Sequence, residues 1–128
     1  MNVSDLIGKP FKWGGCGPDA YDCAGLTEEV LRRYGIVWQR PSCDCQDAVR
    51  IHESIVAEQS LGQWEEVAID RPGDVVLTST NNVWRHVCPV VEGGVLHVSK
   101  ATTGVMLIPR SGLRLYGYQR QRVYRWLG

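Results

Sequence analysis

The chain has 128 residues, a length typical of one domain, so we expect a single domain over residues 1–128 rather than two. Its 14 basic and 14 acidic residues balance, which argues against nucleic acid or an anionic membrane surface as partner. There is no apolar run of transmembrane length and no charged leader at residues 1–6, so we expect no integral membrane contact and no signal peptide. We therefore expect a chain that is cytoplasmic when made, unless another protein carries it or a leader has been trimmed.

The first fifteen residues predict a short helix and then an aromatic segment. Residues 1–7 read as the helix, and Gly8-Lys9-Pro10 ends it. Phe11 and Trp13 follow, and after them two glycines that let a neighbouring backbone approach closely. Such aromatics can wall a pocket, and ordinary core packing beneath a loop explains them equally well.

A second, longer helix is predicted over residues 22–35. Asp22 can cap its first N–H groups, and Gly35 can take the left-handed position that ends it. The helix dipole favours the thiolate of a cysteine in the first turn, yet most free cysteines are small buried apolar residues, and the helix alone favours that role. The apolar stripe of this helix consists of Cys23, Leu26, Val30 and Tyr34.

A third helix is predicted from Ser42 to about Ser60, with His52 on its apolar face as a half-buried histidine rather than a ligand. Cys43 and Cys45 are two positions apart, which places them on different faces of a helix. The sequence has five cysteines and three histidines but no Cys-x-x-Cys motif. We therefore expect reduced thiols and no metal site.

From Trp64 onward the period of the apolar residues becomes that of strands. Helices first and antiparallel strands afterwards predict an α+β domain. Residues 111–118 are expected to form an irregular connection. The five predicted strands cover residues 75–77, 83–91, 95–99, 105–108 and 122–127.

The predicted hairpin around Glu92-Gly93-Gly94 carries His86 and His97. Alternation along the strands puts both histidines on one face of the sheet. A turn centred on Gly93-Gly94 would leave them about 13 Å apart, whereas a turn nearer Val91-Glu92 would set them side by side. Spacing permits a catalytic relay, and two unrelated strand histidines explain it equally well.

Several ordered blocks resemble the NlpC/P60 family of papain-like cysteine peptidases. The segments that carry the resemblance are Tyr21-Asp22-Cys23-Ala24-Gly25-Leu26, Pro72-Gly73-Asp74-Val75-Val76, His86-Val87, Leu96-His97-Val98-Ser99, Pro10-Phe11-Lys12-Trp13-Gly14-Gly15, and Arg40-Pro41-Ser42 with Gln46. The segment from Gly104 through Tyr118 to Trp126 is similar to the version found in phage and prophage tail-associated peptidases.

The resemblance implies a papain-like fold, with N-terminal helices packed on an antiparallel sheet of about five strands. It implies Cys23 as nucleophile, His86 as general base and acid, and His97 as the residue that orients the imidazole. The implied substrate is the stem peptide of peptidoglycan, cut between D-glutamate and a diamino acid, without a metal or organic cofactor. Phage tail proteins are implied as candidate partners, and a phage tail as the site from which the enzyme acts on the cell wall. The implied substrate-binding residues are Phe11, Trp13, Asp22, Ala24 and Trp84.

Three departures from the family pattern concern the substrate more than the reaction. Phe11 replaces a tyrosine, Ala24 stands where serine usually follows the cysteine, and Cys88-Pro89 replaces small residues in the histidine strand. Two alternatives therefore stay open. One is a tail-assembly or adaptor protein that keeps the fold for binding, and the other is a thiol amidase or acyltransferase of the same fold.

Overall fold

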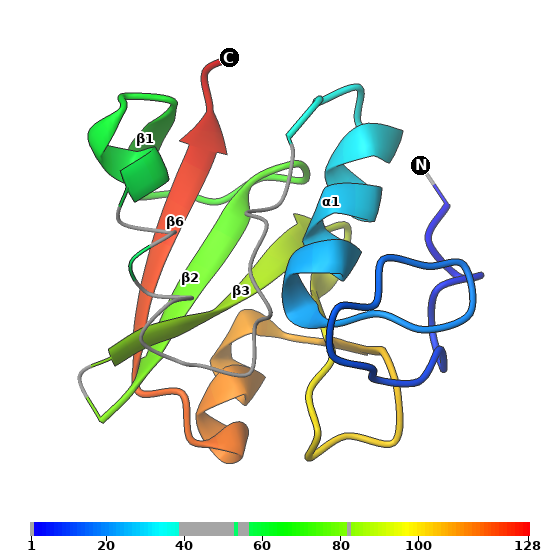
Figure 1. Cartoon of the computed structure of the whole chain (residues 1–128). Coiled ribbons are helices and arrows are strands. Elements are labelled where there is room, and N and C mark those ends of the chain that lie inside the picture. Colours follow the sequence, from blue (N-terminus) through cyan, green and yellow to red (C-terminus); the bar gives the residue numbers. More distant parts are fainter. Residues whose placement is uncertain (1, 39–52, 54–56, 82) are drawn as a thin grey trace.

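The computed structural model describes residues 2–38, 53, 57–81 and 83–128, and it has one helix layer over an antiparallel sheet (Figure 1). The elements in chain order are α1 (Cys23–Arg33), β1 (Trp64–Val67), β2 (Val75–Thr80), β3 (Val83–Val91), β4 (Gly94–His97), β5 (Met106–Ile108), the 3-10 helix η1 (Arg110–Tyr116) and β6 (Arg120–Trp126). The predicted α+β class is confirmed.

The sheet has six strands among the described residues, in the order β1-β6-β2-β3-β4-β5, and every pairing is antiparallel. The sequence predicted about five, and β1 is the strand that it missed. This strand is four residues long, and its two central residues, Glu65 and Glu66, are exposed. A short edge strand with two charged residues at its centre lacks the apolar alternation that marks a strand.

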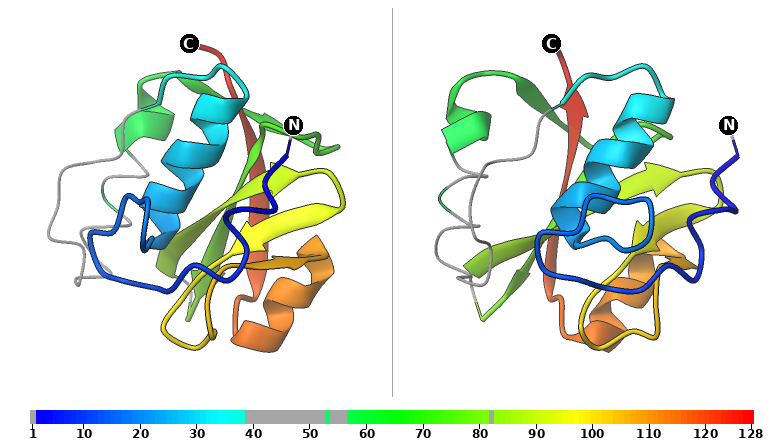
Figure 2. Two further views of the ribbon diagram at one scale, coloured as in Figure 1. Left: turned by 90° about the vertical axis from the view of Figure 1, so that its right-hand side faces the viewer. Right: turned by 45° about the vertical axis from the view of Figure 1, so that its right-hand side comes forward.

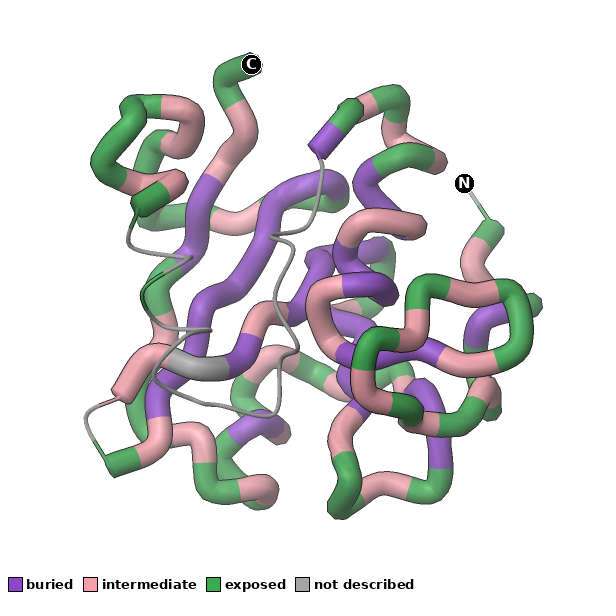
Figure 3. The backbone as a smooth tube through the Cα atoms, in the orientation of Figure 1, coloured by how far each residue is buried: buried purple, intermediate pink, exposed green. Residues whose placement is uncertain are grey.

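Helix α1 packs across one face of the sheet, as the two views in Figure 2 show. Its buried Leu26 and Val30 lie in one apolar cluster with Val91, Leu96 and Val98 from β3, β4 and the residue after β4. These positions lie on one side of the hairpin because side chains alternate along a strand. Figure 3 shows the buried backbone concentrated along the central strands and the inner side of α1.

The opposite face of the sheet has its own apolar cluster, which η1 covers. Leu113 of η1 is fully buried there against Val76, Val90 and Val95. Cys88 belongs to the same cluster and is also fully buried. Cys88 therefore lies on the face of β3 that η1 covers.

Three predicted elements differ from the structure or lie outside it. The predicted helix at residues 1–7 is wrong, because residues 4–8 form turns with hydrogen bonds such as Leu6 N–H to the Val3 carbonyl at 3.0 Å. So short a segment cannot repay the cost of helix nucleation. The irregular connection expected at residues 111–118 is mostly the 3-10 helix η1, which ends at the left-handed Gly117. Most of the predicted helix after Ser42 lies outside the described residues, of which residues 53 and 57–60 are helical.

Among the residues that the structure describes, no helix is both long enough and apolar enough to span a bilayer.

Candidate active site

The cysteine at the start of α1 is positioned by the aspartate before it. Asp22 has extended backbone angles, and its carboxylate oxygen Oδ1 accepts the Gly25 N–H at 2.7 Å. The predicted cap is therefore confirmed, and Cys23 is the first residue of the helix. Its side chain is half-buried, so its thiol lies at the positive end of the helix dipole without being sealed in the core.

The second carboxylate oxygen of Asp22 ties the aromatic segment to the helix. Oδ2 accepts the Gly14 N–H at 2.9 Å, and the Asp22 N–H donates to the Gly15 carbonyl at 3.0 Å. A Cβ at Gly15 would lie 2.8 Å from the Lys12 carbonyl oxygen, so only glycine fits this close approach. The predicted substrate-binding residues Phe11, Trp13 and Asp22 thus belong to one unit beside Cys23, with the Phe11 and Trp13 rings edge to face at 5.1 Å.

The hairpin that carries the histidines turns at Glu92-Gly93. Val91 pairs with Gly94 and Val90 with Val95, one position earlier than a turn at Gly93-Gly94. Extending this register places His97 opposite Cys88, two positions along β3 from His86. The two histidines are therefore diagonal neighbours on one face of the sheet. The observed register lies midway between the two registers that the sequence left open.

A bulge in β3 lies immediately before His86. His86 pairs with Thr78 of β2, but the next β2 residue, Ser79, pairs with Trp84, so residue 85 is the extra one. A bulge bends its strand and redirects the side chains beside it. Regular strand spacing could predict neither this bulge nor the diagonal register, and so it could not predict how close the two histidines lie.

The two histidines form a buried hydrogen-bonded pair. His86 Nε2 and His97 Nδ1 are 2.9 Å apart, and the rings are edge to face at 4.9 Å. His86 is 4% exposed and His97 is 0% exposed. Burial lowers the pKa of His86 well below its ordinary value, and His97 lowers it further. Burial also lowers the pKa of His97 to about 4, so both rings are neutral at neutral pH.

Two tyrosines from the C-terminal segment support this pair, and sequence reasoning missed both. The Tyr118 ring stacks on His86 with centroids 4.4 Å apart and planes within 5°. The Tyr116 ring lies against His97 at 4.7 Å. The available signal was a Tyr-Gly-Tyr sequence that begins at the last residue of η1, in a stretch expected to be an irregular connection.

Cys88 links the nucleophile candidate to the histidines. Its Sγ is 4.0 Å from His97 Nδ1. Burial raises the pKa of the Cys88 thiol well above its usual value, and a thiolate at Cys23 would raise it further. The thiol of Cys23 therefore lies within electrostatic range of Cys88, and α1 packs against β3, which carries both Cys88 and His86.

The other two predicted substrate-binding residues, Ala24 and Trp84, pack against a third apolar cluster that includes Leu31, Leu77 and Tyr124. The guanidinium of Arg122 lies 4.8 Å from the centre of the Trp84 ring. Phe11, by contrast, packs against the first apolar cluster.

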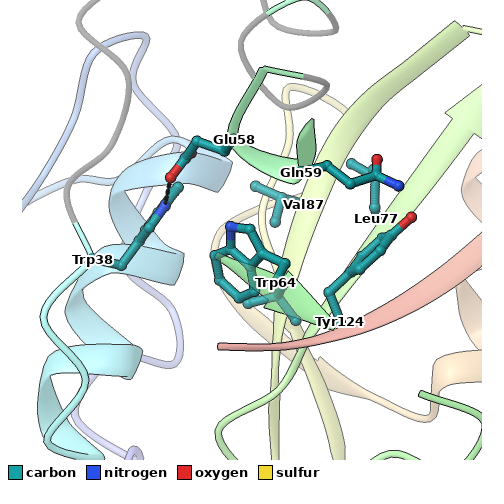
Figure 4. Close-up of a pocket in the computed structure, with 8 residues that line it drawn as sticks. Trp38, Glu58, Gln59, Trp64, Leu77, Val87 and Tyr124 are labelled. Atoms are coloured by element: carbon teal, nitrogen blue, oxygen red, sulfur yellow. Dashed lines mark hydrogen bonds between the residues drawn. The ribbon is translucent and has the colours of Figure 1, made fainter. Parts of the chain in front are cut away.

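An apolar pocket adjoins this third cluster (Figure 4). Trp38 Nε1 donates a hydrogen bond of 2.6 Å to Glu58 Oε1 at its edge, and burial raises the pKa of Glu58. Val87 lines the pocket and follows His86 directly, so the pocket opens on the face of β3 opposite the histidine pair. The remaining candidates, His52, Cys43 and Cys45, lie outside the described residues.

Comparison with known proteins decides the family. Residues 8–122 match the NlpC/P60 family. The chain belongs to the NlpC/P60 family. Two relatives named "Probable endopeptidase p60" come from Listeria grayi and Listeria monocytogenes. The first is 30% identical over 88 residues and the second 32% over 89 residues, in each case 69% of this chain.

The NlpC/P60 domain described here is much shorter than those relatives, since the match covers 15% and 16% of their lengths. Among solved structures, NlpC2 from Trichomonas vaginalis superposes with a TM-score of 0.65 at 20% identity, over 94% of this chain and 43% of that one. The structural likeness shows the fold that the blocks around Cys23, His86 and His97 implied.

Proposed function

We propose that this NlpC/P60 domain is a cysteine peptidase in which Cys23 is the nucleophile, His86 the general base and acid, and His97 the residue that orients His86. The observation that carries the proposal is the buried 2.9 Å hydrogen bond between the two imidazoles. His86 lies on β3, the strand against which the Cys23 helix packs, and His97 lies on the neighbouring β4. The endopeptidase names of the relatives support the same reaction class.

The His86 and His97 tautomers follow from the roles. If His86 Nε2–H donates to His97 Nδ1, the lone pair of His86 Nδ1 is left to take the proton of the Cys23 thiol. His86 is neutral before substrate binds because burial lowers its pKa, so it can accept that proton as the sulfur attacks.

The reaction then proceeds through an acyl-enzyme. The sulfur of Cys23 forms a bond to the substrate carbonyl carbon, and the peptide C–N bond breaks as His86 returns the proton to the leaving amine. Water, deprotonated by His86, then attacks the thioester and releases the acid and the Cys23 thiol. Backbone N–H groups in the first turn of α1 can stabilise the oxyanion of each tetrahedral intermediate.

For the substrate, we propose the peptidoglycan stem peptide, cut between D-glutamate and the diamino acid, as the family resemblance implies. The aromatic segment at Phe11 and Trp13, tied to Asp22 beside Cys23, would form one wall of the binding site.

For the setting, we propose that the domain acts on the cell wall from a phage tail, and tail genes on either side of its own gene would support this.

The test is release of peptide from purified sacculi and from a murein tripeptide by the wild type, Cys23→Ala and Cys16→Ala. Cys16 is an exposed cysteine and serves as the matched control. We expect Cys23→Ala to lose product release and Cys16→Ala to retain it. Equal release by the wild type and Cys23→Ala would overturn the assignment of the nucleophile. No release by any of them would favour a binding role for the fold.

A further inference from the structure

Three side chains of types that bind metal ions meet beneath η1. His86 and Cys88 are two positions apart on β3 and therefore share a face, and His97 lies on the neighbouring β4. One ligand atom from each residue lies within 4.8 Å of the others, and all three residues are buried. The shortest separations are 2.9 Å from His86 Nε2 to His97 Nδ1 and 4.0 Å from His97 Nδ1 to Cys88 Sγ.

These separations are close to those around a tetrahedral zinc ion. With Zn–N bonds of about 2.05 Å and Zn–S bonds of about 2.3 Å, the tetrahedral angle sets N···N at about 3.3 Å and N···S at about 3.6 Å. The two shortest separations each differ from their targets by less than about half an ångström, and the third, between His86 and Cys88, is at most 4.8 Å. Small movements of the side chains would bring the three donor atoms to bonding distance.

The donor set selects zinc among the common divalent ions. Two imidazoles and a thiolate suit a borderline-soft ion and do not suit Mg²⁺ or Ca²⁺, which take oxygen ligands. Three protein ligands leave a fourth tetrahedral position open. Water can fill that position.

We propose that His86, Cys88 and His97 form a Zn²⁺ site whose occupation switches the enzyme off. The inhibition rests on the proposed function, because it needs His86 to be the catalytic base. The binding of zinc does not rest on it. The Cys88 thiol loses its proton to solvent as the Zn–S bond forms. Zinc takes the lone pairs of His86 Nε2 and His97 Nδ1, so the proton that joined them moves to His86 Nδ1. That nitrogen then has no lone pair for the proton of Cys23, and His97 no longer orients the ring.

Binding is tested without any substrate. Co²⁺ is added as a spectroscopic probe to a chain in which Cys16, Cys43 and Cys45 are replaced by alanine, and its thiolate charge-transfer absorption is recorded. Zn²⁺ affinity is then measured by competition with a chromogenic chelator. The same measurements are made after adding Cys88→Ala, Cys88→Val or Cys23→Ala, and circular dichroism checks that each variant is folded. Cys88→Val keeps most of the buried volume at this position.

We expect one metal ion per chain with a thiolate band, which Cys23→Ala retains. Both Cys88 variants should lose the band and weaken Zn²⁺ binding at least about tenfold. The proposal is overturned if the parent chain binds no metal, or if the Cys88 variants bind as tightly as the parent. It is also overturned if Cys23→Ala alone abolishes the band, because the site would then be formed by the nucleophile.

A second measurement connects the site to activity. Zn²⁺ should inhibit peptide release by the parent chain, EDTA should restore it, and the ratio of activity without and with Zn²⁺ should fall in Cys88→Val. Metal binding without any peptidase activity would refute the proposed function and leave the metal site standing. Peptidase activity without metal binding would refute the metal site and leave the proposed function standing.

Discussion

The ring of Tyr118 lies parallel to the ring of His86, with centroids 4.4 Å apart and planes within 5°. The hydrogen bond from Nε2 to His97 holds one edge of the His86 ring. The stacked tyrosine covers one face of the ring and so restrains tilting of the imidazole plane. We therefore expect Tyr118 to act as a positioning residue for the general base.

Replacing Tyr118 with alanine removes the stacked face and should lower kcat by roughly 10 to 100-fold, with a smaller effect on KM. Tyr118→Phe keeps the stacked ring and is the matched control, so its kcat should stay within about threefold of the wild type. The two variants are compared by steady-state kinetics on the murein tripeptide. Equal losses of kcat in both variants would show that the hydroxyl, not the stacking, is what matters.

The buried histidine pair predicts how stability depends on pH. His97 has its folded pKa lowered to about 4 from the ordinary 6.5, so between these values the unfolded chain binds more protons than the folded one. Stability is therefore full above pH 6.5 and falls as the pH drops toward 4. A shift of this size corresponds to about 3 kcal/mol, and the lowered pKa of His86 acts in the same direction.

Urea unfolding between pH 7.5 and 5.5 measures this effect in a range where most carboxylates stay ionised. His97→Asn is the comparison, because asparagine can still accept a hydrogen bond from His86 but does not titrate. The free energy of unfolding should change less with pH in this variant. Identical slopes in the two proteins would mean that His97 does not carry the buried penalty.

Asp22 both caps α1 and holds the Phe11 to Gly15 segment, so one substitution should disturb both. Asp22→Ala removes the acceptors for the Gly25 and Gly14 N–H groups and should lower the free energy of unfolding by about 1 to 3 kcal/mol. KM for the tripeptide should rise, because the aromatic wall loses its tie to the Cys23 helix. Thermal unfolding and steady-state kinetics check the two effects separately.

The matched control for Asp22→Ala is Asp22→Asn, whose single amide oxygen can still cap the Gly25 N–H. Asp22→Asn should retain most of the free energy of unfolding but lose the hydrogen bond from the Gly14 N–H. If Asp22→Asn leaves KM unchanged while Asp22→Ala raises it, the link to Gly14 is not the cause.

Asp74 and Arg125 form an ion pair whose carboxylate is buried. Two guanidinium nitrogens, Nε and Nη2, lie 3.0 and 2.9 Å from the Asp74 oxygens, and the Asp74 side chain is 2% exposed. Asp74→Ala removes the buried acceptor for the Arg125 guanidinium and for the Arg71 N–H, so it should lower the free energy of unfolding more than the loss of an exposed pair does. Arg32→Ala, which breaks an exposed pair with Glu29, should cost less than about 1 kcal/mol. Chemical denaturation of both variants under one condition gives the comparison.

The parts of the fold that sequence reasoning found are those encoded locally. Asp22 before Cys23 and Gly35 after Arg33 mark the limits of α1 because capping depends on residues a few positions apart. The alternation that put His86 and His97 on one face is equally local. The family resemblance supplied the prediction that these signals left open, that Cys23 converges with a hairpin far along the chain.

What sequence reasoning missed depends on contacts between distant segments. The bulge at residue 85 and the diagonal register of β3 and β4 together bring the two imidazoles within 2.9 Å, and neither has a sequence marker. Tyr116 and Tyr118 reach the histidines only because η1 folds over the sheet. Cys88 was noted as a departure from the family pattern, yet its place beside His97 became visible only with the strands paired.

The position of β6 in the sheet sets the order in which the molecule can be completed. The strand made last lies between β1 and β2, and the segment just before it carries the ring that stacks on His86. A nascent chain held at the ribosome therefore has a sheet with a missing interior strand until residues 120–126 have left the exit tunnel.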